Sequence, residues 1–140
     1  MAKQQVPNLE ELDEKEAYRL LTDVFFSGPI PDPDVVYEAN HPGDYVMEMP
    51  QSGEAVRGRE NMRKFQEAYP GSPSIRVRRV LVRDGLWVAE VVNDYGGGQV
   101  SDVAMILELK DGRIWRDRRY YGEPFPAPEW RAQWLERVEF

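Results

Sequence analysis

The sequence has no cysteine and only one histidine, His41. Without thiols the chain forms no disulfide, offers no cysteine nucleophile and provides no thiolate metal ligand. A single imidazole excludes metal sites that need two or three histidines, and it argues against a Ser-His-Asp triad. We therefore expect neither a metal nor a cofactor, and any catalysis would use carboxylate acid–base chemistry.

Long apolar runs and a basic charge balance are missing as well. No stretch reaches the ~20 apolar residues that a membrane-spanning helix needs, and residues 1–12 contain no run typical of a signal peptide. The 18 Lys and Arg residues face 25 Asp and Glu residues, and the net charge of -7 repels phosphate backbones. We expect no membrane and no nucleic acid as partners, with residence in the cytoplasm as the default.

The composition that is present, with 41% hydrophobic and 11% aromatic residues, is typical of a folded chain, and 140 residues fit one domain over residues 1–140. Apolar spacing, capping residues and Gly or Pro breaks predict helices over residues 8–27, 34–40, 59–69 and 126–140. Alternating patterns between Asp-Gly and Gly-Gly breaks predict strands over residues 44–50, 74–84, 86–98, 100–112 and 113–123, and residues 51–58 form a loop or a short hairpin.

This order of elements predicts an α+β fold. Hairpin-linked strands form a mostly antiparallel sheet, and the N-terminal helices pack on one of its faces. A strongly twisted sheet of this length is expected to curl, so that its concave side holds a pocket lined by every second residue of each strand. The last predicted helix, with Trp130, Trp134 and Val138 four residues apart, is expected to pack across the domain.

The same order, together with "MPQSGEAVRGRENM" (49–62) and "LKDGRIWRDRRYYGEPF" (109–125), resembles the nuclear-transport-factor-2-like superfamily and, within it, the SnoaL-like group. The resemblance implies a cone-shaped domain with one deep pocket that often dimerises through its open sheet. The superfamily includes polyketide cyclases, ketosteroid isomerases, limonene epoxide hydrolases, dehydratases and non-catalytic ligand binders, so the resemblance predicts the fold better than the reaction.

In many SnoaL-like members the last strand reads Gly-Lys-Ile-x-x-His-x-Asp, with the His and the Asp facing the pocket. Aligned on Gly112, this pattern places Asp117 at the His position and Arg119 at the Asp position, so the usual catalytic Asp is absent. The Arg-x-Asp pair of the epoxide hydrolases would fall near Val91 and Asn93, which disfavours that chemistry. The resemblance also implies that Glu48 points into the pocket.

The final strand carries an unusual number of charges, and alternation divides them between two faces. Trp115, Asp117, Arg119 and Tyr121 are expected to face the pocket, whereas Arg116, Arg118 and Tyr120 share the other face, in solvent, at a dimer contact or paired with acids of neighbouring strands. Asp117 and Arg119 form either a structural ion pair with each other or part of a ligand site.

The candidate site residues have the following roles if the pocket is functional. Arg119 would clamp a carboxylate or enolate oxygen, and Glu48, the preferred base, or Asp117 would move a proton beside a carbonyl. Tyr121, Asn93 and Tyr95 would donate hydrogen bonds to a developing oxyanion, and Met105 and Trp115 would line the wall.

We therefore expect a pocket for a small hydrophobic carbonyl or carboxylate compound, as in a cofactor-independent isomerase, cyclase or dehydratase. The alternative is a non-catalytic ligand-binding or accessory domain in which Asp117 and Arg119 satisfy each other. In both cases a homodimer through the sheet face of Arg116, Arg118 and Tyr120 is plausible.

Overall fold

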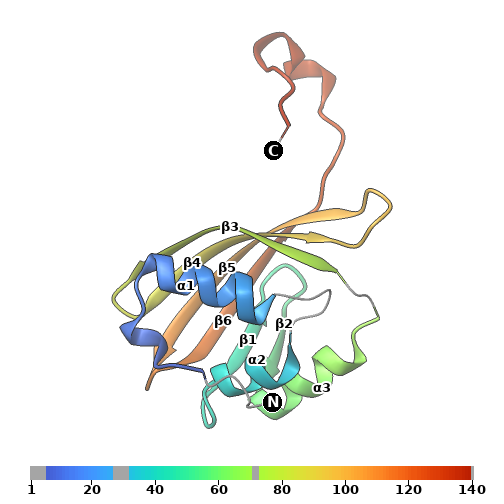
Figure 1. Ribbon diagram of the computed structural model, residues 1–140. Helices are drawn as coiled ribbons and strands as arrows, with labels where there is room; N and C mark the ends of the chain where they lie inside the picture. The colour runs from blue at the N-terminus through green and yellow to red at the C-terminus, as the bar shows by residue number, and fades with distance from the viewer. Residues whose placement is uncertain (1–5, 27–31, 71–72, 140) are drawn as a thin grey trace.

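The computed structural model describes residues 6–26, 32–70 and 73–139, and it has the predicted α+β architecture (Figure 1). The expected end of the first helix at Gly28-Pro29 lies outside the described residues. Gly71, after the helix predicted over residues 59–69, lies outside them as well. The helical elements are η1 (Leu9–Glu11), α1 (Glu14–Leu20), η2 (Leu21–Phe25), α2 (Pro33–Ala39), α3 (Arg59–Ala68) and η3 (Glu129–Trp134). The strands are β1 (Val46–Met49), β2 (Glu54–Arg57), β3 (Ser74–Arg83), β4 (Leu86–Asp94), β5 (Val100–Lys110) and β6 (Arg113–Gly122).

The described strands form one mixed, mostly antiparallel sheet in the order β2-β1-β6-β5-β4-β3. Strands β3 to β6 are a meander of consecutive hairpins, as predicted, and residues 51–58 complete the short β1–β2 hairpin. Among the described strands, only β1 and β6 pair in parallel, with Met47 opposite Asp117. Because of this pairing, a strand near the N-terminus lies beside the last strand of the chain.

The N-terminal helical region differs in detail from the prediction. Asn8 caps only the short η1 turn, and the capping box lies instead at Asp13 and Glu16, where α1 begins. The backbone of Leu12 is extended, so it separates the two elements. Beyond Leu20 the helix continues with π-helical geometry as η2. The cap of α2 is Asp32, which accepts hydrogen bonds from two backbone N–H groups of the first turn.

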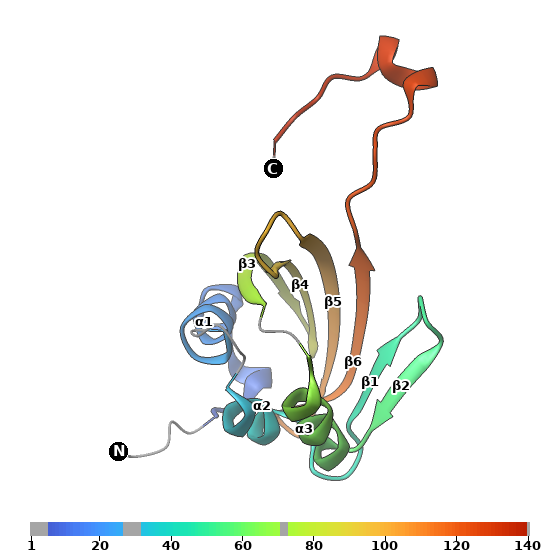
Figure 2. The ribbon, with the colours of Figure 1, turned by 90° about the vertical axis from the view of Figure 1, so that its right-hand side faces the viewer.

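Two expectations about the overall shape are wrong. The described part of the helix predicted over residues 126–140, residues 126–139, is not an α-helix on the domain. Its only regular element is the 3-10 turn η3, on an arm that projects from the end of β6 (Figures 1 and 2). A short helix is marginal in water without a surface to pack on, and this arm packs on none of its own domain's faces. The sheet is also not strongly curled (Figure 2).

The core lies between the sheet and the helices on one of its faces (Figure 2). Alternate residues of β4 and β5, among them Trp87 and Leu107, are buried in one hydrophobic cluster that also includes Leu21 from η2 and Met62 from α3. The helices thus cover the same sheet face as the inward side chains of the meander. Among the described residues, no helix is long and apolar enough to cross a membrane.

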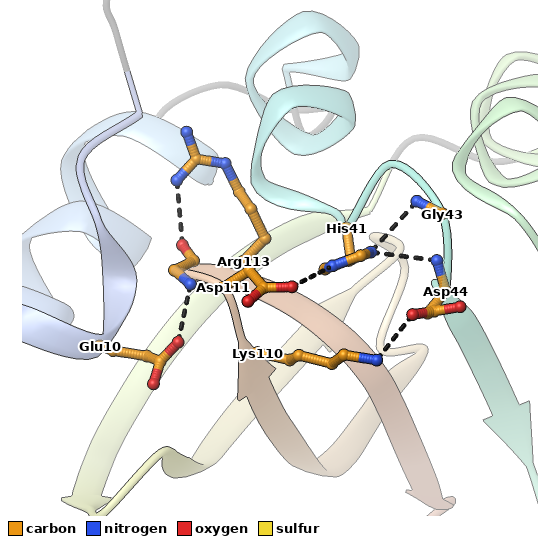
Figure 3. Close-up of polar contacts among 8 residues, drawn as sticks. Glu10, His41, Gly43, Asp44, Lys110, Asp111 and Arg113 are labelled. Atoms are coloured by element: carbon orange, nitrogen blue, oxygen red, sulfur yellow. Dashed lines mark hydrogen bonds and ion pairs between the residues drawn. The ribbon is translucent and has the colours of Figure 1, made fainter.

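A polar cluster at the β5–β6 turn fastens the helical layer to the sheet (Figure 3). His41 Nδ1 accepts hydrogen bonds from the backbone N–H groups of Gly43 and Asp44, at 3.1 and 3.0 Å, so Nε2 carries the proton and donates to Asp111 at 3.0 Å. Lys110 pairs with Asp44 at 2.7 Å. The sole histidine therefore has a structural role in joining the α2–β1 turn to the β5–β6 hairpin.

The β5–β6 turn itself requires glycine. Asp111 and Gly112 both have positive φ, at 54° and 73°, as a type I′ hairpin turn demands. A Cβ on Gly112 would lie 2.6 Å from the side-chain oxygen of Asn8, whereas one on Gly53, with a similar φ of 75°, would meet nothing within 4 Å. A side chain at Gly112 would thus cause both backbone strain and a steric clash, whereas one at Gly53 would cause backbone strain alone.

We predict that Gly112→Ala destabilises the protein by about 2–3 kcal/mol, combining backbone strain of roughly 1–2 kcal/mol with displacement of the Asn8 cap. Gly53→Ala is the matched control and should show only the strain. Urea unfolding of both variants measures the difference, and equal losses of stability would show that the Asn8 contact contributes nothing.

Candidate functional site

The pocket lies between the helices and the inward face of β4, β5 and β6, with apolar walls from Leu21, Phe25, Val91, Met105 and Leu107. Its polar lining comes from Asn40, Gln66, Asn93, Asp117, Arg119 and Tyr121. The free volume is about 60 Å³, well below the roughly 300–1,000 Å³ of a pocket for a drug-sized ligand. In this conformation the pocket therefore accepts only a very small molecule, and a larger one requires side chains at its mouth to move.

Asp117 and Arg119 form a closed ion pair on the pocket wall. Arg119 donates from Nε to Oδ1 at 3.1 Å and from Nη2 to Oδ2 at 2.8 Å, and the hydroxyl of Tyr45 donates to the same Oδ2 at 3.0 Å. The Asp117 residue is 3% exposed, so its charge is held almost entirely by these three bonds. Of the two alternatives for this pair, the structure shows the bidentate ion pair.

The electrostatics of this network follow from burial and from the carboxylate. Burial raises the pKa of Tyr45 well above its ordinary value, and the charge of Asp117 raises it further. Burial alone would lower the pKa of Arg119, but the charge and hydrogen bonds of Asp117 outweigh this effect and raise it well above its ordinary value. Tyr45 therefore stays a neutral donor and Arg119 a permanent cation.

Glu48 does not point into the pocket, so that expectation is wrong. The parallel register places Glu48 opposite Arg118, on the outer face of the sheet. There its Oε1 accepts from Arg116 Nε at 2.7 Å and from Arg118 Nη2 at 3.3 Å, and Arg116 also reaches Glu108 at 3.4 Å. The hydrogen bond from Arg116 lowers the pKa of Glu48. The expected pairing of outer-face arginines with acids of neighbouring strands is confirmed.

Trp115 is the second site residue whose predicted orientation is wrong. Leu109 pairs with Ile114 and Glu108 with Arg116, so Trp115 is the extra residue of a β-bulge in β6. The bulge shifts the alternation, and Ile114 rather than Trp115 joins Asp117 in the pocket lining. Trp115 lies near Lys110, whose Nζ is 5.9 Å from the ring centre.

The remaining predicted site residues line either the pocket or a separate outer cleft. Asn93, Met105 and Tyr121 line the pocket as expected. Tyr95 lies outside it, on an outer cleft of about 610 Å³, where its hydroxyl is 2.9 Å from that of Tyr69. This hydrogen bond, with partial burial, raises the pKa of Tyr69 to about 12. Tyr121 lines both spaces and therefore stands between them.

Asn40 is a pocket residue that sequence reasoning missed. It ends α2, pairs through its backbone with Ile114 and is 2% exposed. Its Nδ2 is buried and has no hydrogen-bond acceptor among the described residues. The only sequence feature that marks Asn40 is its position just before the His-Pro-Gly turn. Nothing in the local pattern shows that the end of this helix reaches the sheet. An amide donor without an acceptor in an apolar pocket is suited to a ligand oxygen.

Taken together, these groups favour binding of an oxygen atom over proton abstraction. Among the described residues that line the pocket, Asp117 is the only one with a carboxylate, and both its oxygens accept from Arg119 or Tyr45. The donors available to a ligand are the amides of Asn40 and Asn93 and the hydroxyl of Tyr121. In the part of the chain that the structure describes, no group of three or more His, Cys, Asp or Glu side chains is placed to hold a metal.

A helix-covered sheet with a pocket on its inner face defines a fold of the nuclear-transport-factor-2-like class, and known proteins agree. An NTF-2 like protein of unknown function from Burkholderia xenovorans LB400 is 28% identical, with a TM-score of 0.72 over 90% of this chain and 98% of its own. A candidate ketosteroid isomerase from Kribbella flavida DSM 17836 is 25% identical, with a TM-score of 0.76 over 89% of this chain and 92% of its own.

The family can be named more closely. A model of the SnoaL-like domain matches residues 31–117, so the chain belongs to the SnoaL-like domain family. A candidate SnoaL-like polyketide cyclase from Jannaschia sp. CCS1 shares the fold at 20% identity, with a TM-score of 0.57 over 86% of this chain and 90% of its own. No match is found among proteins with curated functions.

We predict that Arg119→Met destabilises the protein by roughly 3–5 kcal/mol, because the buried carboxylate of Asp117 loses two of its three donors. Adding Asp117→Asn to this variant removes the unpaired charge and should restore a large part of the lost stability. Urea unfolding of the two variants measures the coupling, and a double variant no more stable than Arg119→Met would contradict it.

The outer-face ion pairs predict a pH effect of known sign. The native pKa of Glu48 lies below its ordinary value of 4.5, so its stabilisation is fully present above that pH and is lost as the pH falls through the native pKa. Glu48→Gln should therefore lose less thermal stability than the wild type between about pH 6 and pH 3. Parallel melting curves for the two proteins would refute the effect.

Proposed function

We propose that this protein binds a small hydrophobic compound with a carbonyl or carboxylate oxygen in the pocket beneath α2. The proposal is carried by Asn40, whose buried Nδ2 lacks an acceptor among the described residues and lies in a mainly apolar lining. A buried donor left unsatisfied costs about 1–3 kcal/mol, so a ligand oxygen that accepts from it recovers that free energy. The apolar wall supplies affinity for the rest of the compound.

The charge distribution of the pocket supports an oxygen-bearing ligand. Arg119 remains cationic and borders the cavity, while its partner carboxylate is saturated by donors. Asn93 adds a second side-chain amide on the same sheet face. The polar groups open to a ligand are thus mainly donors, which match the acceptor oxygens of a ketone, ester or carboxylate.

The second candidate function is cofactor-independent proton transfer, as in isomerisation, cyclisation or dehydration. The observation that favours it is a carboxylate, Asp117, buried on the wall of an apolar pocket. The 25% identity to the candidate ketosteroid isomerase of Kribbella flavida is consistent with this chemistry. For Asp117 to act as a base, a ligand oxygen would have to displace one of its donors, after which the freed carboxylate oxygen accepts a proton from the carbon beside the carbonyl.

A homodimer through the outer sheet face stays a prediction in either case. Tyr120 is exposed on that face, while Arg116 and Arg118 are already paired with Glu48. Paired charges with one exposed aromatic are compatible with a two-fold contact in which the same patch faces itself.

We predict that a thermal-shift screen of small hydrophobic ketones, enones, lactones and carboxylates yields a stabilising ligand. A compound at 100 times its dissociation constant adds about 2.7 kcal/mol, which raises the melting temperature of a domain of this size by several degrees. A panel without any stabilising compound contradicts the proposed binding.

The same screen on Asn40→Leu tests the residue that carries the proposal. This near-isosteric change removes the donor, so the ligand-induced shift should fall by more than half while the fold is kept. Thr22→Val is the matched control, because Thr22 Oγ1 is another buried polar atom without a partner among the described residues, and it does not line the pocket. An Asn40→Leu protein that keeps the full shift removes Asn40 from the site.

Catalysis is tested separately with any carbonyl compound that binds. If Asp117 is a base, the protein should speed hydrogen–deuterium exchange at the carbon beside the carbonyl, and Asp117→Asn should lower that rate about 100-fold or more. Glu48→Gln neutralises a carboxylate outside the pocket and should leave the rate unchanged. Bound ligand without exchange would leave the protein as a binder.

A further inference from the structure

The C-terminal arm, residues 125–139, is an apolar segment without a partner on its own domain. Trp130 and Trp134 are 73% and 70% exposed, and Phe125, Leu135 and Val138 are also exposed. The arm stands clear of the sheet and the helices in both views (Figures 1 and 2). Among the described residues, no hydrogen bond or ion pair joins it to the domain. Exposed aromatics gathered on one segment are typical of an interaction site.

The linker that carries the arm is stiff. In residues 123–128 every position is a proline or directly precedes one. Proline fixes its own φ and restricts the residue before it to extended conformations, and Pro128 has φ -64° and ψ 136°, close to polyproline II. Six such residues span about 19 Å. The linker therefore holds the two tryptophans away from the sheet to which they are attached.

A surface with matching chemistry lies at the root of the arm. The outer cleft of about 610 Å³ is lined by Met49, Phe65, Tyr69, Tyr95 and Tyr121. Glu123 and Pro124, at the start of the linker, also line it. Aromatic and sulfur-containing side chains are favourable partners for tryptophan. The cleft adjoins the inner pocket, because Tyr121 lines both.

The outer face of the sheet matches the arm less well. Its hollow is lined by Val91, Val103, Ala104 and Tyr120, but charged residues border it as well. These are Arg78, Glu90 and Asp102, and Arg78 lies 3.7 Å from Asp102. Covering these charges with tryptophan would remove them from water without new partners. The aromatic cleft is therefore the better receptor.

We propose that the arm of one copy of this chain lies in the outer cleft of a second copy and closes the mouth of that copy's pocket. The root of each arm borders its own cleft, so a two-fold pair with crossing arms fills both clefts with the same contact. Such an exchange leaves neither an arm nor a cleft exposed, and the partner's tryptophans become part of the entrance.

The available surface is sufficient for a stable pair. Each arm presents three large aromatic side chains, and at roughly 150 Å² each the six of a pair bury about 900 Å². Together with the cleft surfaces that they cover, this area reaches the lower end of the range of stable protein–protein interfaces, roughly 1,200 Å².

The absence of native cysteine allows a direct test by cross-linking between chains. One batch carries Gln133→Cys on the arm, which keeps both tryptophans, and another carries Gln99→Cys at the cleft. The two are mixed before treatment with a short bis-maleimide. We expect a covalent dimer that contains one chain of each kind. Arg83→Cys, at the opposite end of the sheet from Gln99, replaces the cleft variant as a control and should give at most a trace of it.

The outcomes of this test are distinct. Efficient cross-linking in the mixture with Gln99→Cys, without it in the mixture with Arg83→Cys, supports the exchange of arms. Equal yields with the Arg83→Cys control, or no covalent dimer in the cleft mixture, overturn it. A chain carrying both Gln133→Cys and Gln99→Cys that forms only an internal cross-link also overturns it, since the arm then covers its own cleft.

A second measurement uses unmodified cysteine-free protein. Analytical ultracentrifugation should show a dimer, and Trp130→Ala with Trp134→Ala should raise its dissociation constant at least tenfold, because tryptophans dominate such contacts. Leu81→Ala, an exposed apolar residue on the outer sheet face, is the matched control and should leave the constant unchanged. A monomeric wild type, or a dimer weakened by Leu81→Ala alone, overturns the proposal.

Discussion

The β-bulge at Trp115 determines which residue at the hairpin end of β6 shares the inner face with Asp117. Because this one residue has no partner on β5, Ile114 and Asp117 share the inner face although they lie three positions apart. Beyond the bulge, regular alternation places Arg116 and Arg118 beside the acids of β1 and β5, and Arg119 beside Asp117. Without the bulge, the inward alternation would continue from Asp117 to Trp115, and the buried hairpin end beside Asn40 would lose Ile114.

The division of charges explains how one strand is strongly polar and still part of the core. On the outer side, Arg116 and Arg118 form partly exposed ion pairs with Glu48, and these pairs contribute little to the free energy of unfolding. On the inner side, a single saturated carboxylate gives the pocket a fixed polar wall whose geometry leaves little freedom to Arg119. The arrangement is thus a rigid donor surface beside apolar residues, with Asn40 and Asn93 as its adaptable members.

Much of the fold was predictable because hairpin signals and helix caps act locally. Asp-Gly and Gly-Gly breaks located four strands. Alternation, with the pocket face taken from the SnoaL-like pattern, placed Asp117 and Arg119 on the pocket face. Glu48 was misplaced although Tyr45, Met47 and Met49 alternate as the larger apolar set, which favours them for the inner face. The bulge, the Asn40 contact and the unpacked C-terminal segment depend on partners distant in sequence, which no local pattern encodes.

The parallel pairing of β1 with β6 has a consequence for how the chain is made. Residues 46–49 can complete their edge only after residues 116–118 have left the ribosome, so the β1–β2 hairpin waits through the synthesis of about half the protein. Within the meander of β3 to β6, each strand pairs with the strand next to it in sequence, so the meander can assemble first. Docking of the early hairpin onto the finished meander would then be the late step of folding, and it is the step at which Tyr45 reaches Asp117 and the pocket becomes complete.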